Sequence, residues 1–233
     1  MQIGLGVGIT FPRPLIGGWS PLDIASLRDW WKISDTSTIT QAGGTASAVA
    51  GQAGNLNLAQ GTPSAQPATG GTIGTNAIHA LSFNSTSQFL AAAATIPQPF
   101  TVATIAQSTS ASLQQALWSF DGSTINNWFG IQSTNTWRAH LGNFSNLSAA
   151  TDTNAHVLIL TVSGGVGTLY IDGTLVATNS PGANSITALR LGLRGDGNQG
   201  WSGKASDSAL FSAVLSTEDR TSLNSYLRDL AGI

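Results

Sequence analysis

The most informative hydrophobic pattern of this chain lies at residues 155–180, where Val157, Ile159 and Thr161 alternate with Leu158, Leu160 and Val162. A run of leucine and β-branched residues ends at Ser163-Gly164-Gly165, and the following run is divided by Asp172-Gly173. An Asp-Gly pair between two such runs favours a type I′ turn, because both of its residues tolerate a positive φ. We therefore predict two successive antiparallel hairpins.

Short runs of strand-forming residues recur from residue 79 to residue 211, with Gly, Asn and Pro between them. Many short strands with such punctuation are typical of a β-sandwich or jelly roll. The sequence therefore predicts an all-β protein, a two-sheet antiparallel jelly-roll sandwich, in which residues 45–74 form loops and an edge strand. The predicted strands are His79–Phe83, Gln88–Ala92, Phe100–Gln107, Gln115–Phe120, Trp128–Gln132, Trp137–Leu141, Val157–Val162, Thr168–Ala177, Ile186–Leu193 and Ala205–Phe211.

Two helices are expected beside these strands. Ser20-Pro21-Leu22-Asp23 combines an N-cap serine, a proline at the first helical position and an acidic residue three positions after the cap. Ser216-Thr217-Glu218-Asp219 is a second capping box. We predict a short N-terminal helix, and a C-terminal helix of about three turns that packs on the sandwich. The apolar positions are Ile24, Leu27 and Trp31 in the first helix, and Leu223, Tyr226, Leu227 and Leu230 in the second.

The first 18 residues place an apolar residue at every second position, with glycines between several of them. A lone strand of this kind needs a sheet edge or a groove to lie on. It is either the first strand of the domain's own sheet or an arm that docks on a neighbouring subunit, and the prolines and glycines at 12–18 favour the arm. We predict a docking arm and linker over residues 1–18 and one jelly-roll domain over residues 19–233. The docking residues are Ile3, Leu5, Val7, Ile9 and Phe11.

The composition narrows the classes of partner. Only 20 of the 233 residues are charged, and the net charge is −2. We therefore expect the surface to consist mainly of uncharged polar side chains. Such a surface suits neutral, hydroxyl-rich partners, and the nine scattered basic residues form no stripe that would follow a nucleic acid. The absence of cysteine excludes disulfides and thiolate chemistry. Without a secretory signal or an apolar run of about 20 residues, we expect synthesis in the cytoplasm and no membrane insertion.

Several motifs occur in the order of a known family. They are the opening stretch at 20–40, the pair Leu81–Asn84 and Gln88–Leu90, the strand Phe100–Gln107, the hairpin Leu169–Gly173, and Trp201–Ser216. Together they cover residues 20–233, and they resemble the concanavalin A-like lectin/glucanase superfamily, especially the laminin-G-like domains in structural proteins of tailed bacteriophages and related particles. The resemblance implies a concanavalin A-like jelly roll in a virion or at a cell surface. It does not imply one ligand, because the fold hosts lectins, hydrolases and spacers.

The sequence shows no established pattern of catalytic or metal-binding residues. A retaining glycosidase needs two carboxyl groups about 5 Å apart, but the single glutamate, Glu218, lies at a helix start. Asp121, Asp172 and Asp196 each precede a glycine, which is typical of turns. The three histidines lie far apart in the sequence and there is no dense series of calcium ligands, so we predict no catalytic residue, no metal and no cofactor. An aspartate pair brought together from separate strands stays open.

The loop at 192–200 is the candidate binding segment. Asp196, Asn198 and Gln199 offer directional hydrogen bonds next to Trp201, and sugars are bound by planar polar groups beside an aromatic face. Trp128 and Trp137 are further candidates for the aromatic face. The alternative is that the tryptophans fill the core, as we expect for Trp118.

These observations lead to one functional expectation. The protein is expected to be a non-enzymatic structural virion protein of a bacteriophage or phage-like particle, such as a fibre, spike or decoration protein, with a jelly roll that binds a host-surface carbohydrate. Its expected partners are other virion proteins, reached through the arm, a bacterial surface glycan and further copies of itself. The alternatives are a glycoside hydrolase that degrades polysaccharide and a free-standing carbohydrate-binding lectin.

Overall fold

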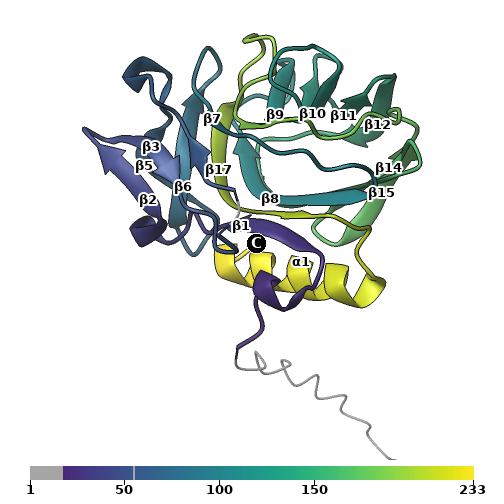
Figure 1. Cartoon of the computed structure of the whole chain (residues 1–233), viewed down its shortest axis with the longest axis horizontal. Helices are drawn as coiled ribbons and strands as arrows, with labels where there is room; N and C mark the ends of the chain where they lie inside the picture. The colour runs from purple at the N-terminus through teal and green to yellow at the C-terminus, as the bar shows by residue number, and fades with distance from the viewer. Residues whose placement is uncertain (1–17, 55) are drawn as a thin grey trace, which may run out of the picture.

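The computed structural model describes residues 18–54 and 56–233, which form two stacked antiparallel β-sheets with one helix on the outside (Figure 1). Hydrogen-bonded neighbours in the first layer, the front sheet, follow the order β12-β11-β10-β9-β16-β7-β4-β3-β2. In the second layer, the back sheet, the order is β15-β14-β13-β8-β17-β6-β5, and β1 also pairs with β17. A single pairing between β3 and β5 joins the two layers at one corner.

The strands are short, as expected for a sandwich. The front sheet contains β2 (Ile39–Ala42), β3 (Thr45–Val49), β4 (Leu58–Ala59), β7 (Leu90–Ala92), β9 (Gln115–Ser119), β10 (Asn127–Gln132), β11 (Thr136–Leu141), β12 (Phe144–Ala150) and β16 (Leu189–Leu191). The back sheet contains β1 (Leu27–Trp31), β5 (Ala68–Ile73), β6 (Ile78–Asn84), β8 (Phe100–Ser108), β13 (Ala155–Ser163), β14 (Val166–Ile171), β15 (Thr174–Asn179) and β17 (Ser202–Phe211). The helices are α1 (Thr217–Ala231) and three single 3-10 turns, η1 (Pro21–Asp23), η2 (Thr36–Thr38) and η3 (Pro63–Ala65).

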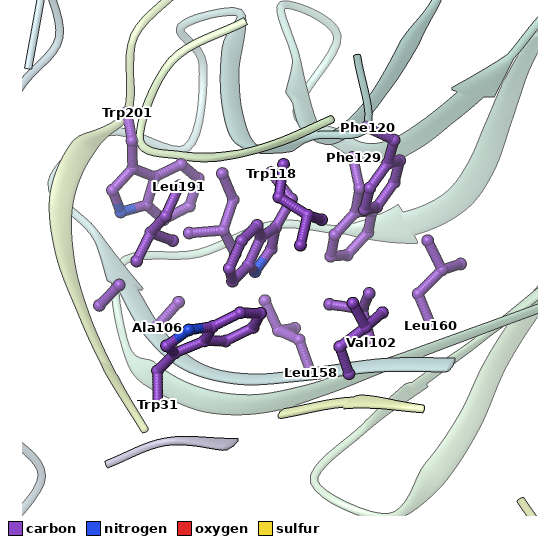
Figure 2. Packing of buried hydrophobic residues seen from close by; sticks show 14 of the residues in the cluster. Trp31, Val102, Ala106, Trp118, Phe120, Phe129, Leu158, Leu160, Leu191 and Trp201 are labelled. Atoms are coloured by element: carbon purple, nitrogen blue, oxygen red, sulfur yellow. The ribbon is translucent and has the colours of Figure 1, made fainter. Parts of the chain in front are cut away.

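Two hydrophobic cores hold the layers together. The main core lies between the sheets, where the rings of Trp31 and Trp118 are 5.5 Å apart (Figure 2). The second core lies between the back sheet and α1, which contributes Leu223 and Leu227. The helix therefore covers the outer face of the back sheet and leaves the outer face of the front sheet to the loops (Figure 1).

The two predicted hairpins are confirmed. Gly164 and Gly165 have φ values of 56° and 81°, and Asp172 and Gly173 have values of 51° and 84°, so both two-residue turns occupy the left-handed region. The Asp172 carboxylate accepts a hydrogen bond from the backbone N–H of Val157 at 2.9 Å, which fixes this turn against β13. The C-terminal helix is also confirmed, since the Ser216 hydroxyl caps it by accepting from the backbone N–H of Asp219 at 3.0 Å.

The predicted N-terminal helix is wrong beyond its first turn. The capping box at Ser20 forms, but it holds only η1, and the chain is extended again from Leu27 as β1. Trp31 lies in the main core and its neighbour Trp30 in the second core. Adjacent side chains point to opposite sides only in a strand, so burying both indoles requires the extended conformation.

The segment from residue 45 to residue 74 contains more strand than predicted. It supplies β3, β4 and β5, although its many Ala, Gly, Ser and Thr residues show no clear periodicity. β12 was also absent from the predicted strands. Pairing with neighbouring strands, which is a tertiary property, decides the conformation of such weakly patterned segments. The docking residues Ile3, Leu5, Val7, Ile9 and Phe11 lie outside the described residues.

No helix within the described ranges is long and apolar enough to cross a lipid bilayer.

A carboxyl group is buried at the bulge in β17. Asp207 is fully buried, and its carboxylate accepts from the backbone N–H of Ser34 at 2.7 Å and from the Trp30 indole N–H at 3.3 Å. Burial raises the pKa of Asp207 from 3.8 to about 6, because desolvation outweighs both hydrogen bonds. The folded protein therefore binds a proton that the unfolded chain releases near pH 4.

We expect this carboxyl to make stability fall as the pH rises. The folded-state pKa is raised, so the contribution is fully present below pH 4 and is lost through pH 6. The difference is about 3 kcal/mol between these limits. Urea unfolding at pH 4 and pH 7 should show that Asp207→Asn, which keeps an acceptor for Ser34, loses this much of the wild-type pH dependence. Equal pH dependence of the two proteins would show that the pKa of Asp207 is the same in the folded and the unfolded protein.

Candidate functional site

Direct cross-strand neighbours form one continuous row of residues across the outer face of the front sheet. From β11 to β2 the row runs His140, Trp128, Ser119, Arg190, Ala91, Ala59, Ala48 and Thr40. Their sequence neighbours, such as Phe129 and Leu191, belong to the main core, so the row faces away from it. The alanine half of the row is partly or fully exposed, whereas Trp128, Ser119 and His140 are buried.

Two loops cover the buried half of this row, and Arg190 forms hydrogen bonds to both of them. They are residues 120–126, between β9 and β10, and residues 192–201, between β16 and β17. The Arg190 guanidinium donates to the carbonyls of Gly122 and Gly195, both at 2.9 Å, and stacks 4.7 Å from the centre of the Phe89 ring. A side chain at Gly195 would overlap the Asp121 carboxylate, so the loops meet closely at this glycine.

The polar residues predicted in the 192–201 loop do come together, around an arginine that the sequence analysis missed. Arg194 donates to both oxygens of Asp196, at 2.8 and 2.7 Å, and to the side-chain oxygen of Gln199. The Asn198 amide donates to Asp196 at 3.0 Å. The hydrogen bond from Arg194 is the main reason why the pKa of Asp196 lies well below its usual range. The short spacing Arg-x-Asp was the only signal in the sequence that pointed to this pair.

Two buried polar atoms on β10 have no hydrogen-bond partner within the described part of the chain. They are the indole Nε1 of Trp128 and the side-chain Oε1 of Gln132. Both residues lie on the outer face, on either side of Gly130, and Gly130 pairs with Arg138 of β11. Buried polar atoms in folded proteins are almost always hydrogen-bonded, so this donor and this acceptor can take a hydrogen bond from a water molecule or a ligand.

His140 lies next to Trp128 on the neighbouring strand and is held neutral by its surroundings. Burial lowers the pKa of His140, and the positive charges of Arg138 and Arg194 lower it further. Backbone groups of Gly142 and Ile125 hydrogen-bond to the imidazole, which connects it to the 120–126 loop. We define Trp128, Gln132, Arg138, His140, Arg194, Asp196 and Gln199 as the outer-face site.

The tryptophans do not supply the expected aromatic faces. Trp201 and Trp137 are 0% and 4% exposed, and their rings stack 6.4 Å apart in the main core, where Figure 2 shows Trp201 pointing between the sheets. Trp128 faces outward, but it is 0% exposed beneath the loops. The prediction that these rings stack on a sugar is therefore corrected: packing and the loop roof cover all three. Trp118 fills the core as predicted.

No group of three or more potential metal ligands occurs among residues 18–54 and 56–233.

The sequence supports the fold directly. Residues 82–219, more than half of the chain, match the family model Laminin_G_3, described as the concanavalin A-like lectin/glucanases superfamily. The chain belongs to this family, and the predicted all-β jelly-roll class is confirmed. No curated protein sequence matches the chain.

Solved structures with the same fold share little sequence with this chain. Domain 4 of AbnA, an extracellular arabinanase from Geobacillus stearothermophilus solved with arabinotriose, is 13% identical with a TM-score of 0.61, and the match covers 85% of this chain and 98% of that domain. Trypanosoma rangeli sialidase in complex with the inhibitor DANA is 14% identical with a TM-score of 0.59, covering 86% of this chain and 33% of the sialidase. The receptor-binding domain of botulinum neurotoxin type G is 11% identical with a TM-score of 0.61, covering 87% and 52%. The chain thus spans about a third of the sialidase and half of the toxin domain.

Proposed function

We propose that the protein is a non-enzymatic carbohydrate-binding jelly roll whose ligand occupies the outer-face site. The observation that carries this proposal is the unpartnered donor of Trp128 and acceptor of Gln132, placed beside the polar loop of Asp196 and Gln199. A sugar presents hydroxyl groups that donate and accept at once, which matches such a mixed set. The arabinanase domain, which was solved with arabinotriose, shows that a domain of this fold is compatible with a saccharide ligand.

A binding role fits the carboxylates of the site better than hydrolysis does. Asp196 is paired with Arg194, and its low pKa makes it a poor general acid. Asp121 accepts from the backbone N–H groups of Ser123 and Thr124, at 3.3 and 2.9 Å, so its carboxylate stabilises its own loop. Neither group resembles the proton donor that a glycosidase requires. Release of reducing ends from a capsular polysaccharide would overturn this part of the proposal.

We extend the proposal to the setting of the protein: it is a structural component of a bacteriophage or phage-like particle, which docks through residues 1–18 and forms homo-oligomers. The alternating apolar pattern of residues 3–11 supports the docking role. Among residues 18–54 and 56–233, the members of both hydrophobic cores extend from Trp19 to the C-terminus. A largely uncharged polar surface suits a protein that faces a glycan-rich cell envelope.

The glycan proposal predicts a selective loss of binding. Asp196→Asn removes the charge that orients Arg194, and we expect the affinity for a bacterial surface glycan to fall at least tenfold, which is about 1.4 kcal/mol. The measurement is a glycan array followed by calorimetry on the best ligand. Asp229→Asn makes the same change on the exposed surface of α1 and should bind like the wild type. If both variants bound the glycan equally well, the ligand would not bind at the outer-face site.

The arm proposal predicts that residues 1–18 are needed for attachment and self-association but not for the stability of the domain. We expect a chain that starts at Trp19 to unfold at nearly the same temperature as the full chain, because it keeps every described member of the two cores. It should lose particle attachment and self-association. Light-scattering masses of the two chains, measured side by side, test this. Unfolding of the shortened chain would make the segment a core strand, and an unchanged mass and attachment would favour a free-standing lectin.

A further inference from the structure

One histidine outside the outer-face site, His156, joins two aspartates from different segments of the chain. It lies in β13, and its Nδ1 is 2.7 Å from a carboxylate oxygen of Asp172, in the β14–β15 turn. Its Nε2 is 2.9 Å from a carboxylate oxygen of Asp152, in the 151–154 loop that links β12 to β13. We call these three residues the His156 triad. It lies where the chain passes from the front sheet to the back sheet.

The His156 side chain faces the space between the two sheets. Its neighbour Val157 belongs to the second core, and its cross-strand partner Ala106 belongs to the main core. The side chain of His156 is 20% exposed, against 31% for Asp172 and 50% for Asp152. The imidazole is therefore partly shielded from water, and its interaction with the two carboxylates is screened less than that of a surface pair.

The neighbouring elements bring little further charge to the triad. β8, which pairs with β13 at this point, and β12, at the edge of the front sheet, contain no ionisable side chain. Arg138 and His140 on β11 alternate with residues of the main core, so they lie on the outer face of the front sheet. Lys204 on β17 and Tyr170 on β14 lie on the helix side of the back sheet. On α1, the positive charge of Arg228 acts on the aspartate of the turn.

Both contacts of the triad require a positively charged imidazole. A neutral imidazole has one N–H, whereas an imidazolium has two and can donate to both carboxylates. The hydrogen bond to Asp172 is the main reason why the pKa of His156 lies above 6.5, and the bond to Asp152 raises this pKa further, although burial opposes them. Burial also disfavours the ionised forms of Asp152 and Asp172, but the hydrogen bonds that they accept keep the pKa of each below 3.8. Of the triad, therefore, only His156 changes its charge near neutral pH.

The two carboxylates are held in place differently. Asp172 also accepts from the backbone N–H of Val157 at 2.9 Å, which ties it to β13 itself. Asp152 also accepts from the backbone N–H of Asn154 at 2.7 Å and from its side-chain amide at 3.0 Å, which are groups of its own loop. When His156 loses one proton, the remaining N–H therefore stays with Asp172, and Nε2 presents a lone pair to Asp152.

We propose that the His156 triad is a pH-sensitive switch, which fastens the 151–154 loop to the β14–β15 turn when the imidazole is protonated and releases the loop when Nε2 gives its proton to the solvent. The loop has one further contact that reports on this change, because the backbone N–H of Thr151 donates to the carbonyl of Asn135 at 3.1 Å, in the β10–β11 turn. The pKa of His156 is raised in the folded protein, so the stabilisation by the triad is fully present below pH 6.5 and is lost as the pH rises through the folded-state pKa.

Spectra of the histidine ring in the wild-type chain test the switch directly. Long-range ¹H–¹⁵N correlation spectra, recorded from about pH 5.5 to about pH 8.5, distinguish the two ring nitrogens and their protonation. We expect both nitrogens of His156 to carry a proton at the acidic end, the midpoint to lie above 6.5, and the proton to remain on Nδ1 at the alkaline end. A midpoint at or below 6.5, or a proton that remains on Nε2, would overturn the proposal.

Hydrogen exchange tests the release of the loop. After correction for the intrinsic pH dependence of exchange, we expect the protection of the Thr151 and Asn154 amides to fall about tenfold over the same range, as for the loss of one hydrogen bond to a charged group. His156→Gln cannot gain a charge and should abolish this pH dependence. His79→Gln makes the same change on β6 and should keep it.

Protection that does not change with pH in the wild type, or a pH dependence that survives His156→Gln, would overturn the switch. The two wild-type measurements decide the question even if His156→Gln does not fold. None of them involves a ligand, so their outcome is independent of the proposed carbohydrate site.

Discussion

Replacing Trp118 by alanine is expected to lower the free energy of unfolding by about 4 kcal/mol, from the cavity and the lost burial. Trp118 is 1% exposed, its ring packs against that of Trp31 in a tilted arrangement with 5.5 Å between the ring centres, and its indole N–H donates to the Thr104 hydroxyl at 2.7 Å. It therefore joins β9 of the front sheet to β8 of the back sheet by packing and by a hydrogen bond. Urea denaturation of the wild type and the variant measures the loss.

Two further variants separate packing from hydrogen bonding at this position. Thr104→Val keeps the volume but leaves the indole N–H buried without an acceptor, so we expect a loss of about 1–3 kcal/mol. Trp118→Phe keeps an aromatic ring and should fall between Thr104→Val and Trp118→Ala. A loss below about 1 kcal/mol for Trp118→Ala would show that the sheets do not depend on this indole, since core truncations of this size normally cost more.

Replacing Asp29 by alanine is the second change with a large expected effect, a loss of about 3 kcal/mol or more. Asp29 lies in β1 and is fully buried, and its carboxylate accepts from the backbone N–H groups of Ala53 and Leu56, at 2.9 and 2.6 Å. Alanine would leave these donors without their acceptor. A side chain at Gly51 would overlap the carboxylate, so this loop is shaped around Asp29.

Hydrogen exchange shows whether the effect is local. The amides of Ala53 and Leu56 should exchange much faster in Asp29→Ala, because their acceptor is gone. Asp29→Asn keeps one oxygen acceptor and should cost less than alanine. Asp229→Ala on the exposed surface of α1 is the control and should change stability by less than about 0.5 kcal/mol. Unchanged protection of both amides would contradict the anchoring role of Asp29.

The fold class could be predicted because turns and helix caps are formed by residues that are close together in the sequence. Gly164-Gly165 and Asp172-Gly173 favour positive φ values through their own residue types, and Ser216 caps α1 from its own sequence neighbourhood. The same reasoning failed at 27–31, where helical spacing competed with burial of two adjacent indoles on opposite sides. Local signals predict well when no long-range contact opposes them.

The binding residues were predicted only in part. Asp196, Asn198 and Gln199 are close in the sequence, and the ten-residue loop 192–201 brings them together. The row from His140 to Thr40 cannot be seen in the sequence, because each member comes from a different strand and their order depends on the pairing register. Likewise, no spacing distinguishes Trp128 on the outer face from Trp201 in the core.

The sequence alone determined that the chain is an all-β sandwich with turns at defined positions, a capped C-terminal helix and a sparsely charged surface. Strand alternation, turn geometry and capping depend on residues that are neighbours in the sequence, so they can be predicted from the sequence alone. Only the tertiary structure decided which indoles are buried, which carboxylates are paired, and that Arg138 and Arg194 both lie near His140. These outcomes depend on strand register and on loops packing over the sheet, and residues far apart in the chain set both.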